Sequence, residues 1–163
     1  MLDGIINSVK GQVANTIAEK TGLSMGQAEE AVPMAKDSIV DGVMGAVSGG
    51  NLGGVMGLFG KSSGGGGLVQ NMVYKSIAGS FINKITSKFG IPESMASTVS
   101  SFALPMIMEK ISGSVSNDKG EVDKGNLMKT FGIDAGSLMG NAADAMKDKL
   151  GDKLGGGIGK MFG

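Results

Sequence analysis

The feature that most constrains this fold is an internal repeat: the chain aligns with itself at a shift of 68 residues. Residues 5–48 pair with residues 73–116 without a gap, and twelve of the 44 aligned pairs are identical. The identical pairs include Gly11 with Gly79, Lys20 with Lys88, Gly22 with Gly90, and Gly45 with Gly113. Such self-similarity indicates a duplicated structural unit. The two copies can pack within one chain or exchange between chains.

Each copy is expected to contain two helices. In residues 2–17 apolar side chains recur at steps of three and four, the period of an amphipathic helix. Lys20 followed by Gly22 predicts the end of this helix, because glycine favours the left-handed residue that closes a helix. Ser24 and Gln27 then form a capping-box pattern that starts a second helix.

The second copy repeats these signals, and no segment alternates as a strand does. Lys88 and Gly90 end its first helix, with Pro92 at the start of the next. Pro33 and Pro105 fall inside the second helix of each copy, and we expect each to kink or split its helix. The predicted fold class is all-α: an internally duplicated helical repeat, two helices per copy, plus a C-terminal amphipathic helix.

The predicted organisation has four parts. Residues 1–59 form copy 1 and residues 68–132 form copy 2. Residues 60–67, GKSSGGGG, form a flexible Gly/Ser linker. Residues 133–163 form the C-terminal helix and a Gly-rich tail.

The side chains that are missing exclude much chemistry. The chain has no His and no Cys, and every one of its fifteen cationic side chains is a lysine. It therefore lacks an imidazole base, a thiolate nucleophile and the usual zinc ligands. Nothing in the pattern positions a Ser–Lys pair for catalysis. We expect no enzymatic activity, no catalytic residue, no cofactor and no metal, and the net charge of zero gives no reason to expect nucleic-acid binding.

Charge is unevenly distributed along the chain. Residues 1–48 hold three lysines and six acidic residues, whereas residues 42–92 hold four lysines and no acid. The acidic part can pair with the basic helix expected at 68–89, within one molecule or between neighbours.

Residues 42–60, GVMGAVSGGNLGGVMGLFG, are nineteen residues without a charge. The favoured interpretation is a mobile Gly-rich loop, because each of the eight glycines costs about 1 kcal/mol in a helix. A helix here would instead carry a seam of small residues suited to close helix packing, either in a membrane or against another protein. The residues of this candidate interaction seam are Gly42, Gly45, Gly49, Gly53, Gly57 and, at the position equivalent to Gly45, Gly113.

The tail at 147–163 has lysines on one face and apolar residues on the other, as in an interfacial helix. Aspartates between the lysines weaken attraction to anionic lipid, so docking on its own core or on a neighbouring subunit is favoured. The candidate tail contacts are Leu150, Leu154, Ile158, Met161 and Phe162.

Two phrases carry a resemblance to a known family: TGLSMGQAEEAVPMAK in copy 1 and FGIPESMASTVSSFALPMIMEK in copy 2. Together with the Gly-rich Leu52–Gly60 segment, they resemble the small, Gly-rich, all-helical YidB-like bacterial proteins of unknown function. The resemblance implies a helical fold and carries over no catalytic residue.

The sequence predicts a non-enzymatic structural or interaction protein. We expect it to self-associate, as a homo-oligomer or filament, through helix faces rich in Gly and Met. Another protein is a possible partner. The alternative is a peripheral membrane-active or lipid-binding protein that uses residues 42–60 or the tail. No signal peptide or convincing transmembrane segment is evident, so a cytoplasmic location is expected.

Overall fold

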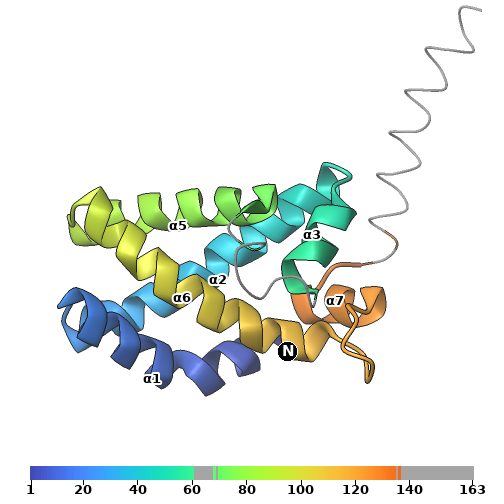
Figure 1. Ribbon diagram of the computed structural model, residues 1–163, viewed down its shortest axis with the longest axis horizontal. Coiled ribbons are helices and arrows are strands. Elements are labelled where there is room, and N and C mark those ends of the chain that lie inside the picture. The colour runs from blue at the N-terminus through green and yellow to red at the C-terminus, as the bar shows by residue number, and fades with distance from the viewer. Residues whose placement is uncertain (61–67, 69, 135, 137–163) are drawn as a thin grey trace, which may run out of the picture.

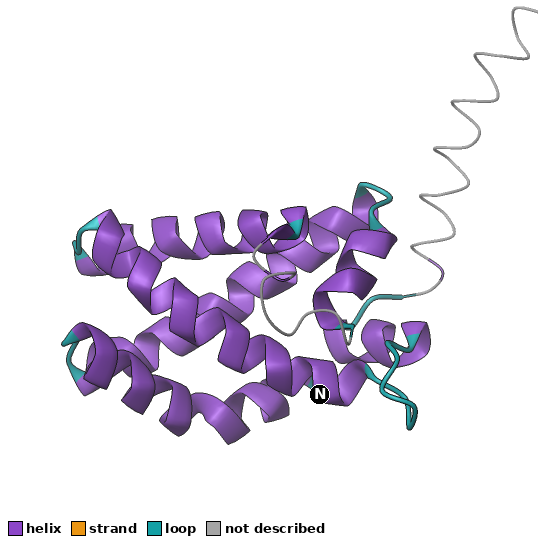
Figure 2. Ribbon diagram, in the orientation of Figure 1, coloured by secondary structure: helices purple, strands orange, loops and turns teal. Residues whose placement is uncertain are grey.

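The computed structural model describes residues 1–60, 68, 70–134 and 136, and within this part the fold is all-helical (Figures 1 and 2). The helices are α1 (Leu2–Thr21), α2 (Met25–Ser48), α3 (Leu52–Phe59), α5 (Met72–Phe89), α6 (Glu93–Val115) and α7 (Lys124–Phe131). Among the described residues, the one β pairing is an isolated bridge between Ser116 and Val122. The predicted all-α class is confirmed.

The two halves of the chain have the same order of helices, two long ones and then a short one. α1 packs against α6, and α2 packs against α5, so the first long helix of each half lies on the second long helix of the other (Figure 1). The two halves therefore pack together within one chain. Each half contains a third helix, α3 or α7, beyond the two long helices expected from the sequence.

The helix ends follow the predicted signals. α1 and α5 end at Gly22 and Gly90, whose φ angles of 73° and 63° are left-handed. α2 begins with the capping box: the Ser24 hydroxyl accepts from the Gln27 amide, and the Gln27 side chain accepts from the Ser24 amide.

The core lies between the two halves and is built mainly from aliphatic side chains. The expected stripe on α1 is buried at Ile6, Val9, Val13 and Ile17. The largest fully buried side chains come from both halves: Phe59, Phe81, Ile17, Ile39, Leu58, Ile77, Ile85, Leu104, Ile107, Ile111, Leu127 and Val13. Neither half buries its apolar face alone, which explains why the duplicated units stay together.

Of the two outcomes expected at Pro33 and Pro105, a kinked or a split helix, the split is wrong. α2 runs continuously from Met25 to Ser48 and α6 from Glu93 to Val115. A proline frees the carbonyl four residues earlier, which here belongs to Glu29 or Ser101. Both of these residues are exposed, so water can hydrate the freed carbonyls.

The interpretation of residues 42–60 as a loop is also wrong over most of its length. α2 continues to Ser48, a turn occupies residues 49–51, and α3 follows. Three of the eight residues of α3, namely Val55, Leu58 and Phe59, are buried in the core. Burial of these side chains offsets the weak helix propensity of the glycines.

Candidate functional site

The structure separates Gly42, which packs against another helix of the chain, from the exposed glycines of the candidate seam. Gly42 lies where α2 crosses α5, and a Cβ placed on it would overlap Cγ1 of Ile77. Glycine is therefore needed there for close approach of two helices within the chain. Gly42 therefore serves packing within the chain, and it also lines the pocket beside Gly45 described below.

Gly45 lies three residues further along α2 and is exposed. No atom lies within 4 Å of a Cβ placed on Gly45, so its backbone is open to contact from outside. A shallow pocket of about 220 Å³ lies beside it, and its lining is mixed: Gly42, Ala46, Met72 and Val73 together with the polar Asp41, Asn51 and Ser76. Met72 is 79 % exposed, an unusual degree for a large apolar side chain. We call Gly45, Ala46 and Met72 the Gly45 surface; Val73, beneath them, is buried in the core.

The other seam glycines do not continue this surface along one helix. Gly49 caps α2, so the turn that follows breaks the four-residue spacing. Gly53 and Gly57 are exposed on α3, and Gly57 lies beside the Asn71 side chain. The seam predicted from regular spacing is thus two separate short segments.

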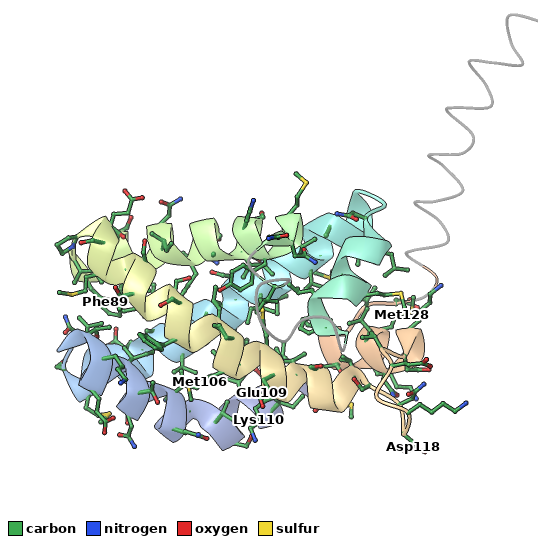
Figure 3. The ribbon with its side chains drawn as sticks, viewed as in Figure 1. Phe89, Met106, Glu109, Lys110, Asp118 and Met128 are labelled. Carbon is green, nitrogen blue, oxygen red and sulfur yellow. The ribbon has the colours of Figure 1, made fainter. Side chains whose placement is uncertain are left out.

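Gly113 is exposed on α6, and the space around it is open as at Gly45. Its surroundings are polar: Glu109 and Lys110, labelled on α6 in Figure 3, are both exposed. Ser112, beside it, donates from its hydroxyl to the Phe59 carbonyl oxygen at 2.6 Å. Gly45 also has an acidic residue one turn earlier, Asp41, which lines its pocket, so the two glycines share this polar feature.

The acidic and basic parts of the chain meet inside one molecule. Lys84 of α5 forms an ion pair with Asp41 of α2, with 2.9 Å between Nζ and Oδ2. On the rest of α5, Lys75 and Lys88 remain exposed. The expected pairing of the acidic part with the basic helix is therefore present within the chain, as an ion pair between α5 and α2.

A second ion pair joins the start of α1 to α2. The Nζ atom of Lys36 lies 2.6 Å from Oδ1 of Asp3. The hydrogen bond from Lys36, together with its positive charge, lowers the pKa of Asp3 below its ordinary value. The same hydrogen bond raises the pKa of Lys36.

The part of the chain that the structure describes contains no cluster of three or more His, Cys, Asp or Glu residues that could hold a metal ion. None of its helices is long and apolar enough to cross a membrane. The candidate tail contacts, Leu150, Leu154, Ile158, Met161 and Phe162, lie outside the described residues.

Two contacts that hold α3 were not foreseen from the sequence. The Asn71 side chain caps α5 by accepting from the amides of Val73 and Tyr74, and its Nδ2 donates to the Gly54 carbonyl at 2.9 Å. Ser112 provides the other contact, described above. An asparagine before an apolar run signals the cap, but nothing local signals a partner seventeen residues away.

A family model described as "Bacterial protein of unknown function (DUF937)" matches the chain twice, at residues 3–73 and at residues 71–163. The boundary between the two matches lies at the start of α5, close to the boundary between the halves. No curated protein and no solved structure matches the chain.

Proposed function

We propose that this protein, which belongs to the DUF937 family of bacterial proteins of unknown function, is a non-enzymatic structural protein that self-associates through the Gly45 surface. We place it among the YidB-like members of that family, on the helix-entry and Gly-rich phrases of its sequence. The proposal depends on one observation: an exposed glycine of a long helix lies beside a nearly fully exposed methionine.

The chemistry of the Gly45 surface suits a helix as its partner. A glycine without neighbours lets another helix approach the backbone closely, as Gly42 lets α5 approach α2 in this chain. Met72 can adapt its shape to the partner, because methionine is unbranched and flexible. Its exposed apolar area would be removed from water by such a contact.

The sequence favours a second copy of this chain as the partner, because two of its own helices carry exposed charges of opposite sign. Lys75 and Lys88 are exposed on α5, and Glu29 and Glu30 are exposed on α2. These opposite charges on different helices favour a contact between unlike faces of two molecules. Contacts between unlike faces produce rings or open filaments.

The variant Gly45→Leu tests the proposal, with Gly11→Leu as its matched control. Both glycines are exposed inside long helices, and both have open space around a Cβ. Leucine raises helix propensity by about 1 kcal/mol at either position, so both variants should fold at least as stably. Light scattering should show a lower particle mass for Gly45→Leu only. An unchanged mass would exclude the Gly45 surface as the interface.

A further inference from the structure

The two halves differ where the third helix meets the rest of the bundle. α3 packs against α2, α5 and α6, whereas α7 packs mainly against α6. In the first half Asn71 joins the start of α5 to α3: its side chain donates a hydrogen bond to the Gly54 carbonyl and lies against Gly57. Extending the internal alignment by two residues places Asp3 opposite Asn71. Aligning α3 with α7 by their last residues, Phe59 and Phe131, places Lys129 opposite Gly57.

The corresponding contact between α1 and α7 is missing from the second half. The Asp3 carboxylate accepts a hydrogen bond from Lys36 of α2 instead. A cavity of about 380 Å³ remains between α1, α2 and α7, with Leu2, Val40 and Phe131 among the residues that line it. Its charged residues are of both signs: Asp3, Lys36, Asp37 and Lys129.

A second shallow cavity, of about 370 Å³, adjoins the first and shares Lys129 and Gly132 with it. It is more apolar, with Met128 and Ile133 in its lining; Met128 is labelled beside α7 in Figure 3. We call the two cavities together the α7 groove. The groove offers apolar side chains bordered by both lysines and aspartates.

We propose that the α7 groove binds the chain's own C-terminal segment, residues 137–163. The sequence of this segment has apolar residues at every fourth position from Leu138 to Ile158, and between Lys147 and Lys153 it alternates lysine with aspartate. Apolar residues bordered by charges of both signs match the groove in kind. The other undescribed run of several residues, 61–67 (KSSGGGG), has no apolar side chain to offer the groove.

The position of the chain favours this occupant over a second copy. Asp134 lines the groove, so the segment begins at its rim. A tether this short gives an effective concentration on the order of millimolar. A segment from another molecule is present only at the protein concentration. At micromolar protein the groove should therefore be occupied by the chain's own segment.

Paramagnetic broadening of methionine methyl signals in the full chain tests this proposal. Because the chain has no cysteine, Lys160→Cys provides a single site for a spin label without altering the apolar series. Met128 lines the groove, whereas Met25 starts α2 at the other end of the bundle (Figure 1). The label should remove most of the Met128 signal and leave the Met25 signal intact. Equal broadening of both signals, or of neither, would overturn the proposal.

Two further measurements distinguish the alternatives. Leu150→Asp should restore the Met128 signal, and the matched control Gly151→Asp should not, because it adds the same charge beside the apolar series. Mixing spin-labelled chains with separate isotope-labelled chains should leave Met128 unbroadened. Broadening in the mixture would show that the segment binds a second copy and would contradict the proposal, whatever the outcome of the Gly45→Leu test.

Discussion

Phe59 and Phe131 lie against each other, with their ring centroids 5.6 Å apart and their planes tilted by 41°. Phe59 ends α3 and Phe131 ends α7, so the two rings occupy equivalent positions in the two halves. In a symmetric dimer, equivalent residues touch next to the two-fold axis. The halves of this chain thus meet as two subunits would, and the surface between them is already used within the molecule.

Removing either ring should destabilise the whole bundle. Phe59 is fully buried and Phe131 nearly so. Phe59→Ala should lower the free energy of unfolding by about 3–5 kcal/mol, and Phe131→Ala by somewhat less. Urea unfolding followed by circular dichroism measures both. Two separate transitions in the wild-type chain would show that the halves fold independently, against the shared core.

Gly42 and Gly45 should respond oppositely to alanine. A Cβ at position 42 overlaps Ile77, which is fully buried and cannot move freely, so Gly42→Ala should cost about 1–3 kcal/mol. Gly45→Ala meets no atom and should stabilise the protein by up to about 1 kcal/mol. Thermal unfolding of the two variants provides the comparison. A stabilising Gly42→Ala would mean that α2 and α5 do not cross there.

Asn71→Asp isolates the contact between α5 and α3. Aspartate caps a helix as well as asparagine does, but a carboxylate cannot donate to the Gly54 carbonyl. The variant should lose about 0.5–1.5 kcal/mol, the net contribution of one hydrogen bond, because the bond is only part-buried. Chemical denaturation measures the loss, and Asn51→Asp, which changes a cap without this second bond, is the control.

The Asp3–Lys36 pair should make a pH-dependent contribution to stability. Because the pKa of Asp3 is lowered in the folded chain, the pair stabilises the fold above the ordinary value of 3.8, and this stabilisation is lost as pH falls below it. Because the pKa of Lys36 is raised, the stabilisation is also lost above 10.5. Asp3→Asn should lower Tm slightly at neutral pH and not at all in strong acid.

Asp37→Asn removes the same formal charge from the same end of the bundle and serves as the control. Asp37 lies 4.0 Å from Lys36 and forms no hydrogen bond with it, so its loss should change Tm less. A Tm difference for Asp3→Asn that persists far below pH 3.8 would show that the effect is not electrostatic.

Local signals in the sequence predicted the long helices well. Gly22 and Gly90 end their helices in the left-handed conformation, and Ser24 forms the capping box with Gln27. These signals act within a few residues, so one sequence suffices to recognise them. The apolar stripe of α1 was likewise predicted, because its period is that of the helix itself.

The candidate surface could be located only in part. All seam glycines look alike in the sequence, and only the crossing with Ile77 separates Gly42 from the exposed Gly45. α3 was missed because propensity disfavours a glycine-rich helix, whereas burial of Val55 and Phe59 stabilises it. Both outcomes depend on residues distant in sequence, which local patterns do not report.

The most direct test of self-association is the mass of the wild-type protein by light scattering over a wide range of concentrations, at low and high salt. Self-association through the Gly45 surface predicts a mass above the 16.4 kDa of one chain, rising with concentration. The exposed charges of α5 and α2 predict that salt lowers this mass. A constant mass of 16.4 kDa at every concentration and salt would contradict the account.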